Sequence, residues 1–292
     1  MTVACPFLKW VGGKRQLLPQ LCRYVPRGAT YYEPFLGGGA AFFAFKELGR
    51  FDDAVLNDEN AELMNSYRVV RDTPLELISR LDALRRSPTW NTNETYLEMR
   101  ESVPSDEVSR AVRFIYLNRM GFNGLYRVNR EGHFNVPKGS YPNPALYDRM
   151  TLLSCAEALS SKTTKLREGD YAVAVQDAGP GDVVYFDPPY VPVSATSSFT
   201  SYIGEFGPEQ QQALAQTFRE LVDRGVFCVL SNSDVALVRE LYQGFDVHVV
   251  PARRSVNSDP SGRGEVDEVI VVGRPRHWVD RAVRDVFSMM EF

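Results

Sequence analysis

The tetrapeptide Asp187-Pro188-Pro189-Tyr190 is the part of the sequence best suited to chemistry. It directly follows the apolar run 183–186, which has the composition of a strand buried on both faces. Two consecutive prolines fix two φ angles and remove two backbone donors, so the chain is stiff there and neighbouring carbonyl groups can accept hydrogen bonds. An acidic side chain, a carbonyl group and an aromatic ring are therefore expected at the carboxyl end of a strand, where open α/β sheets bind ligands.

A planar amino group on a base ring is the substrate group that this trio would suit. The Asp187 carboxylate and the Pro188 carbonyl can each accept one N–H of such a group. These two bonds favour a pyramidal nitrogen, whose lone pair is then localised for attack. Tyr190 offers a face on which the base can stack. The alternative is a tight turn with a solvent-exposed aspartate, but the buried strand before the turn favours the functional interpretation.

A second motif places Gly37-Gly38-Gly39 before a helix that starts at Ala40. Glycine loops at helix starts let the backbone approach a ligand closely. The dinucleotide pattern G-x-G-x-x-G fails, because Phe42 stands where the third glycine should be, and a plain Gly-rich connection is the alternative. Asp58 lies nineteen positions after Gly39, at the end of the next predicted strand, where an acidic side chain can accept hydrogen bonds from a ribose. A helix N-cap is the other interpretation of Asp58.

The elements that must position these motifs are strands alternating with helices. Continuous β-branched or aromatic runs predict strands at 54–56, 183–186, 226–230 and 269–272. Pro208 opens one predicted helix, and Ser233 is the predicted N-cap of another, which Gly244 ends. This rhythm is typical of an α/β sheet.

The middle of the chain, residues 61–150, contains few strand runs. Leu77, Ile78, Leu81 and Leu84 mark an amphipathic helix. Residues 105–150 hold seven basic and four acidic side chains, a net charge of +3, interleaved with aromatic residues. We therefore predict that 61–150 is a helical insertion that binds a large nucleic acid, and that 1–60 together with 151–292 form the α/β domain.

The composition limits what else the protein can be. Its 292 residues are 44% hydrophobic and 24% charged, which excludes disorder, collagen and coiled coil as the main description. The net charge of −4 argues against coating nucleic acid by bulk charge, although local patches remain possible. Four cysteines without C-x-x-C spacing and three histidines argue against a structural zinc site, and no apolar run could span a membrane. We expect a cytoplasmic, monomeric, metal-free protein.

Eight short motifs, taken together in their order along the chain, are more specific than any one of them alone. They are F-L-K-W-V-G-G-K at 7–14, E-P-F-L-G-G-G at 33–39, N-D-E-N at 57–60, L-N-R-M-G-F-N-G-L-Y-R-V-N at 117–129, F-N-V-P at 134–137, D-P-P-Y at 187–190, S-N-S-D at 231–234 and R-R-S-V at 253–256. Together they resemble the Dam-type DNA adenine methyltransferases, the α-group amino-methyltransferases, over about Phe7 to Val272. The resemblance implies a seven-stranded, Rossmann-like methyltransferase sheet with an inserted helical target-recognition domain. It also implies methyl transfer from S-adenosylmethionine to a flipped adenine in double-stranded DNA, and hence association with the nucleoid through DNA.

The resemblance also assigns roles to particular residues. It implies a catalytic site at Asp187, Pro188, Pro189 and Tyr190, and a cofactor site at Trp10, Lys14, Glu33, Gly37, Gly38, Gly39, Asp58, Asp170, Tyr171 and Asp187. The DNA contacts that it implies are Lys9, Arg119, Phe122, Asn123, Leu125, Arg127, Asn135, Pro137 and Lys138. Among these, Lys9 and Arg127 resemble the base-reading cations, and Phe122 stands where the family often has a tyrosine that inserts into the duplex.

The recognition site that the resemblance implies most strongly is 5′-GATC, although a longer site stays open. Two other functional classes also stay open. One is a methyltransferase that acts on RNA or on a protein glutamine amide, against which the basic, aromatic insertion argues. The other is a non-catalytic DNA-binding relative, against which the intact D-P-P-Y motif and glycine loop argue.

Overall fold

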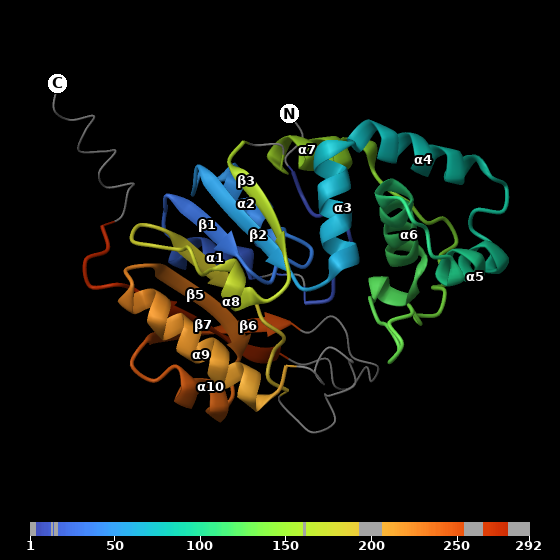
Figure 1. Cartoon of the computed structure of the whole chain (residues 1–292). Helices are drawn as coiled ribbons and strands as arrows, with labels where there is room; N and C mark the ends of the chain where they lie inside the picture. The colour runs from blue at the N-terminus through green and yellow to red at the C-terminus, as the bar shows by residue number, and fades with distance from the viewer. Residues whose placement is uncertain are drawn as a thin grey trace. The chain divides into compact units, whose positions relative to one another are not determined.

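The computed structural model of the protein describes residues 4–12, 14, 17–159, 162–192, 206–253 and 265–279. Within these residues the strands are β1 (Thr30–Glu33), β2 (Asp53–Asp58), β3 (Thr164–Glu168), β4 (Val183–Phe186), β5 (Phe227–Ser233), β6 (Asp246–Arg253) and β7 (Glu265–Gly273). They form one seven-stranded sheet in the order β3-β2-β1-β4-β5-β7-β6 (Figure 1). β1 pairs in parallel with β2 and β4, and β4 with β5, whereas β7 is antiparallel to both β5 and β6. The predicted α/β fold with a seven-stranded sheet is confirmed.

The described residues also form ten α-helices. They are α1 (Leu18–Tyr24), α2 (Ala40–Glu47), α3 (Ala61–Asp72), α4 (Pro74–Arg86), α5 (Asn93–Glu101), α6 (Glu107–Met120), α7 (Arg149–Leu159), α8 (Tyr171–Ala174), α9 (Pro208–Asp223) and α10 (Ala236–Leu241). The chain divides into two compact units. The first unit is Met1–Gly13, Leu36–Glu47 and Asn57–Gly169, and the second unit is Lys14–Phe35, Leu48–Leu56 and Asp170–Phe292.

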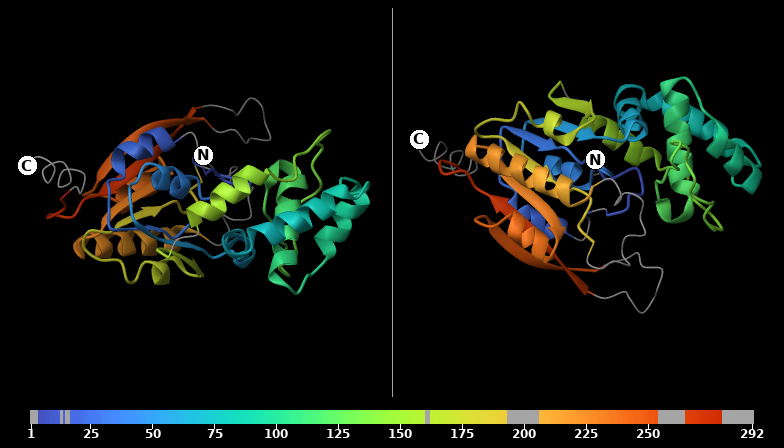
Figure 2. Two further views of the ribbon diagram at one scale, coloured as in Figure 1. Left: turned by 90° about the horizontal axis from the view of Figure 1, so that it is seen from above. Right: turned by 60° about the horizontal axis from the view of Figure 1, so that its bottom comes forward.

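The core of the second unit lies between α9 and the central strands. Leu214, Phe218 and Leu221 recur at helical spacing on α9 and pack against the fully buried strands β4 and β5. Figure 2 shows α9 and α10 on one face of these strands. On the opposite face, Tyr24 of α1 stacks on His248 of β6 with ring centroids 4.4 Å apart. Every residue of β4 and β5 is buried, so both faces of these strands are covered, which explains the apolar runs in their sequence.

The first unit is dominated by helices with well-defined starts. The Asn60 side chain accepts a hydrogen bond from the Leu63 amide at the start of α3, and Asp106 does the same for Ser109 at the start of α6. Arg110 of α6 forms an ion pair with Glu62 of α3, which joins the two helices. The predicted amphipathic helix around Leu81 is confirmed as α4.

One local prediction is wrong. Ser233 is not a helix cap, because β5 continues through it in antiparallel register with Glu268 of β7, and its side chain is buried. The N-cap of α10 is Val235, which makes no side-chain capping bond. Of the sequence motifs, Gly13 and residues 254–256 lie outside the described part of the chain.

Candidate active site

The D-P-P-Y turn lies in the second unit, at the carboxyl end of β4. β4 pairs with β1, and the strand order reverses between these two strands, which is where open α/β sheets bind ligands. Phe186 lies in register with Leu230 of β5, so Asp187 comes beside Ser231. Ser231 Oγ donates a hydrogen bond to Asp187 Oδ1 over 2.9 Å. The turn is therefore fixed to its neighbouring strand through the carboxylate.

A cation and an aromatic ring meet at this carboxylate. Lys14 Nζ lies 3.0 Å from Asp187 Oδ1 and 4.2 Å from the centroid of the Tyr190 ring. Burial raises the pKa of Asp187, and the Lys14 ammonium and the Ser231 hydrogen bond oppose this shift. The site thus combines a half-buried acceptor with a ring face, and a donor nitrogen already contacts both of them.

Buried amide side chains hold the rest of the turn in place. Gln211 of α9 donates to the Pro189 carbonyl over 2.8 Å, and the Val191 amide donates to Asn232 Oδ1 over 3.0 Å. Asn232 Nδ2 in turn donates to Gln211 Oε1 over 3.1 Å. Tyr190 OH donates to Glu268 Oε2 of β7 over 3.0 Å. The backbone and the ring of the turn are consequently fixed by α9, β5 and β7.

The other predicted cofactor residues of the second unit have partners within the protein. Glu33, at the end of β1, is buried and accepts a hydrogen bond from Tyr31 OH over 2.7 Å. Asp170 caps α8 by accepting the Ala172 amide over 2.8 Å, and the Tyr171 ring stacks on Phe35 at 5.2 Å. Both carboxyl groups therefore also stabilise local structure.

The glycine loop lies in the first unit, before α2. A Cβ atom on Gly37, whose φ is +48°, would lie 2.8 Å from the Trp10 ring. A Cβ atom on Gly39, whose φ is +69°, would lie 2.7 Å from Tyr67 OH. Tyr67 OH also donates to the Gly37 carbonyl over 3.0 Å. The loop needs glycine so that these two aromatic side chains can approach, a reason that the sequence analysis missed.

Asp58, at the end of β2, is joined to the glycine loop. Its Oδ2 accepts the Gly37 amide over 2.9 Å, and its Oδ1 accepts the Asn60 amide over 3.0 Å. Because Asn60 is the N-cap of α3, the alternative interpretation of Asp58 as that cap is wrong. Burial raises the pKa of Asp58 to about 6, although the hydrogen bonds from these backbone amides oppose the shift.

The predicted DNA contacts are gathered on what we call the recognition surface of the first unit. Its exposed members are Lys9, Phe122, Asn123, Arg127 and Pro137, and its partly buried members are Leu125, Asn135 and Lys138. The buried Asn118 side chain joins the two segments that carry them. Its Oδ1 accepts the Lys9 amide over 2.9 Å, and its Nδ2 donates to the carbonyls of Lys9 and Gly124 over 2.6 and 3.2 Å.

Two arginines near this surface are bound to the protein itself. Arg127 Nε donates to Asn135 Oδ1 over 2.7 Å, so Asn135 orients the guanidinium. Arg119 Nη2 donates to the Phe7 carbonyl over 2.6 Å, which anchors the segment that carries Lys9. Arg119 therefore has a structural contact in addition to its predicted contact with DNA.

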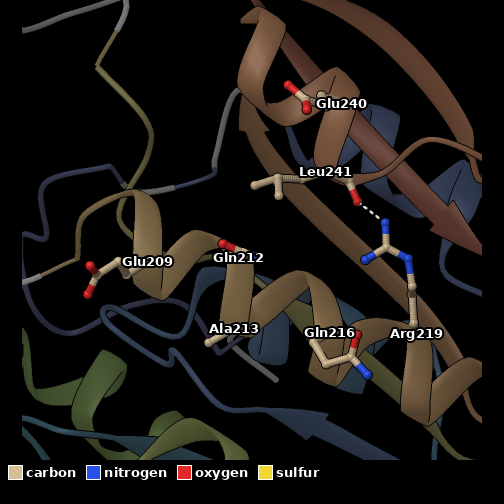
Figure 3. Close-up of a pocket in the computed structure, with 7 residues that line it drawn as sticks. All are labelled: Glu209, Gln212, Ala213, Gln216, Arg219, Glu240 and Leu241. Atoms are coloured by element: carbon tan, nitrogen blue, oxygen red, sulfur yellow. Dashed lines mark hydrogen bonds between the residues drawn. The ribbon is translucent and has the colours of Figure 1, made fainter.

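A pocket of about 500 Å³ lies elsewhere in the second unit, between α9 and α10 (Figure 3). Its lining residues are Glu209, Gln212, Ala213, Gln216, Arg219, Glu240 and Leu241. The Arg219 guanidinium points across it and donates to the Leu241 carbonyl. None of the predicted site residues lines this pocket. Within the described residues there is no cluster of metal-ligating side chains. No helix among them is long and apolar enough to cross a membrane.

Comparison with known proteins identifies the family. The model of the D12 class N6 adenine-specific DNA methyltransferases matches residues 10–256. The chain belongs to this family. It is 45% identical to the type II methyltransferase M1.LlaDCHI of Lactococcus lactis subsp. cremoris, over 91% of this chain and 94% of that protein. It is 39% identical to the type II methyltransferase M.MjaIII of Methanocaldococcus jannaschii, over 86% of this chain and 92% of that protein.

The DNA adenine methylase of Escherichia coli K12 is also similar, with 39% identity over 92% of this chain and 95% of that protein. These matches confirm the predicted family and the predicted class of enzyme. The chain is an adenine-specific DNA methyltransferase of the D12 class.

Several residues that position the site of this methyltransferase were missed by sequence reasoning. Asn118 and Ser231 lie inside motifs quoted above, so the sequence marked their positions, but it did not indicate what they contact. No sequence motif marks Gln211 or Glu268, because they reach the turn only through the packing of α9 and the antiparallel pairing of β7.

Proposed function

We propose that this methyltransferase transfers the methyl group of S-adenosylmethionine to N6 of an adenine that has left the stack of double-stranded DNA, within 5′-GATC. The observation that carries the proposal is the Asp187 carboxylate, whose Oδ1 is held by Ser231 beside the Tyr190 ring. A base inside a duplex cannot reach such a turn, so the target must be extruded, at a cost of a few kcal/mol.

The residues of the turn would bind and orient the amino group. Asp187 and the Pro188 carbonyl would each accept one N–H of N6, which leaves the nitrogen lone pair directed away from both acceptors. Tyr190 would stack on the base. When bound, S-adenosylmethionine supplies a methyl group on a positively charged sulfur, which keeps the electron pair of the broken bond. Asp187 can hold the proton that N6 must lose, and alignment of the two reactants can contribute about 7–11 kcal/mol.

Lys14 stands in the way of the adenine in its present position. Its ammonium is an N–H donor to Asp187, the proposed acceptor for the amino group, and it lies over the Tyr190 ring, on which the base is proposed to stack. Lys14 must therefore leave its place over the Tyr190 ring when the base stacks on that face, although it can keep its contact with Asp187 Oδ1.

The donor set fits S-adenosylmethionine. Each Asp58 oxygen accepts one backbone amide, and a carboxylate oxygen has two lone pairs, so Asp58 can still accept hydrogen bonds from ribose hydroxyl groups. Lys14 suits the carboxylate of the methionine part. Trp10 and Tyr171 are aromatic rings, each of which also stacks within the protein, Trp10 on Phe114 and Tyr126, and Tyr171 on Phe35. The assignment of these residues to one cofactor comes from the family resemblance, as do the assignments of Glu33, Asp170 and the glycine loop.

The recognition surface supports the choice of DNA as substrate. Arg127 can make a bidentate contact with guanine, and Lys9 can donate to a second base. Phe122 is exposed and can insert between base pairs, as apolar side chains do in other DNA complexes. We propose that residues 61–150 form the target-recognition domain and that the catalytic domain comprises 1–60 and 151–292.

Methylome sequencing tests the proposal in one experiment. DNA from a methylation-free host that expresses the chain should carry N6-methyladenine at 5′-GATC, and DNA from a host that expresses Asp187→Ala should not. N6-methyladenine in another sequence would overturn the recognition assignment while leaving the chemistry intact. Absence of N6-methyladenine, with the protein expressed and folded, would overturn the proposed reaction.

A further inference from the structure

Within the described part of the chain, the Asp187 carboxylate is held on one side only. Among the described residues, both donors to it, Lys14 Nζ and Ser231 Oγ, use Oδ1. Ser231 itself is fully buried in β5, and its Oγ lies 2.9 Å from Tyr185 OH, which is fully buried in β4. A short chain of hydroxyl groups therefore runs from the interior of the sheet to the acidic turn.

We propose that Ser231, held by Tyr185, is a positioning residue that fixes the plane of the Asp187 carboxylate and thereby presents Oδ2 to the amino group of the target base. The inference rests on the proposed function, because it assigns a cause to the orientation of the proposed acceptor.

The carboxylate needs such a constraint. Rotation about the last torsion of an aspartate side chain is only weakly restricted, so the plane of the carboxylate can swing unless a partner holds it. Lys14 is a poor holder, because its ammonium ends a flexible four-carbon stem. Ser231 has a short side chain on a central strand, and the pairing of Phe186 with Leu230 fixes its distance from the turn. The hydroxyl of Ser231 is thus the rigid donor of the pair.

The direction of the hydrogen bonds follows from the charges nearby. A carboxylate only accepts, so Ser231 donates its single proton to Asp187, and Tyr185 must donate to Ser231. Burial, with Asp187, Glu33 and Glu268 nearby, raises the pKa of Tyr185 well above its usual value, so Tyr185 keeps its proton. Tyr190 is likewise neutral, because burial raises its pKa, and Lys14 is the cation that faces the carboxylate.

The same strand supplies a matched control. Ser233 lies two residues further along β5 and is also buried, but its Oγ has no hydrogen-bond partner within the described part of the chain. Ser231→Ala and Ser233→Ala each remove one buried hydroxyl from one strand. A general effect of losing a hydroxyl would appear in both variants, whereas loss of the Asp187 constraint would appear only in the first.

Steady-state methylation of duplex DNA across pH tests the inference. For Ser231→Ala we expect kcat to fall about tenfold, which corresponds to about 1.4 kcal/mol, with KM for DNA within about twofold of wild type. The acidic limb of its kcat profile should also move to higher pH, because a hydrogen bond that lowers the pKa of Asp187 is lost. Ser233→Ala should match wild type in both measurements.

Tyr185→Phe gives a second, independent variant, since it frees Ser231 without touching the turn. It should shift kcat and the acidic limb in the same direction as Ser231→Ala, by a smaller amount, and it carries the test if Ser231→Ala fails to fold. Wild-type protein that does not methylate adenine would sink the proposed function. Active wild type, with both Ser231→Ala and Tyr185→Phe matching Ser233→Ala, would sink the positioning role alone.

Discussion

The acidic turn of the second unit and the recognition surface of the first unit are stabilised at different levels. In the turn, side chains hold side chains: Ser231 holds Asp187, and Glu268 holds Tyr190. On the recognition surface, Asn118 fixes the backbone, and the side chains of Lys9, Phe122 and Arg127 are exposed. Lys9 Nζ lies over the Tyr141 ring, and Arg127 Nε donates to Asn135.

This difference matches two different tasks. A group that takes part in a reaction gains most from being held in its reactive geometry before the substrate arrives. A group that reads DNA must instead adjust to the base edge that it meets, so a fixed backbone and an exposed side chain suit it better. The comparison predicts that substitutions in the turn reduce the rate of methyl transfer, whereas substitutions on the recognition surface reduce sequence specificity.

The largest effect should come from Asp187→Ala. Loss of the acceptor should reduce the rate of methyl transfer by about 10²–10³-fold or more, as for other charge-stabilising groups in active sites. Binding of duplex DNA should stay measurable, because the recognition surface is unchanged. Single-turnover methyl transfer and a DNA binding titration on the same preparation measure the two quantities. Near-normal methyl transfer by this variant would show that the Asp187 carboxylate takes no essential part in the reaction.

The backbone of the recognition surface can be tested with two glycines that both have positive φ. A Cβ atom on Gly124, whose φ is +65°, would lie 2.4 Å from Lys9 Cβ, whereas one on Gly132, whose φ is +81°, would meet nothing within 4 Å. Both alanine variants carry the strain of a positive φ, but only Gly124→Ala also displaces Lys9. Since a displacement of about 1 Å can cost about 10²-fold, methylation of the target site should fall by roughly that factor in Gly124→Ala.

Gly132→Ala should keep most of its activity, and melting temperatures of the two variants report the shared strain. Equal losses of methylation in both variants would show that backbone strain, and not the position of Lys9, limits recognition.

The sequence predicted the turn and its strands well because the signal was local. β2, β4, β5 and β7 contain continuous apolar runs, and Asp187 directly follows one of them. The bounds of β1, β3 and β6 were not predicted, and for β3 the reason is equally local. β3 reads Thr-Lys-Leu-Arg-Glu and lies at one edge of the sheet with most of its side chains at least partly exposed, so it has no apolar run to detect.

What the sequence could not give was the set of partners that come from distant segments. Ser231 and Asp187 are 44 positions apart, and Tyr190 and Glu268 are 78 apart, so only the register of the strands brings them together. The misassigned Ser233 has the same cause. A serine before an apolar helical stretch is typical of a cap, and only the pairing with Glu268 shows that the strand continues through it.

The reading of bases should depend on Arg127 and on the side chain that orients it. Arg127→Ala should relax the choice of one base by roughly tenfold, because a bidentate contact with guanine contributes about 1–3 kcal/mol of discrimination. Asn135→Ala should relax the same base by less, since it removes only the side-chain contact to Nε, while the carbonyl of residue 135 can still accept from Arg127 Nη2 over 3.3 Å. Methylation of a set of single-substitution duplexes measures both effects.

Lys138→Ala provides the contrast on the same surface. Loss of a phosphate contact should weaken binding of all sequences alike and reduce the salt dependence of the affinity by about one contact. If Arg127→Ala and Lys138→Ala changed all duplexes equally, Arg127 would not be a base reader.

The smallest effect should be a pH dependence of cofactor binding that comes from Asp58. Like Asp187 it is a carboxyl group with a raised pKa, but its donors are backbone amides of the first unit. In the folded protein the pKa is about 6, above the usual value near 4 in an unfolded chain. Folding therefore favours protonation of the Asp58 carboxylate when the pH is lowered from 7 to 5. The stability that Asp58 contributes is fully present below about pH 4 and is lost as the pH rises through about 6.

As the pH falls below about 6, the affinity for the cofactor product and the stability that Asp58 contributes to the fold should therefore change in opposite directions. Protonated Asp58 accepts hydrogen bonds from ribose hydroxyl groups poorly, so the affinity for S-adenosylhomocysteine should fall by up to about tenfold per pH unit below pH 6. The contribution of Asp58 to the free energy of unfolding should not fall with it, because its protonation is favoured in the folded state. Calorimetric titrations between pH 5 and 8, with thermal melts at each pH, separate the two quantities. Asp58→Asn should bind weakly at every pH and should lose this dependence. A dependence that persists in Asp58→Asn would assign the titration to another group and leave Asp58 with only its two backbone amides.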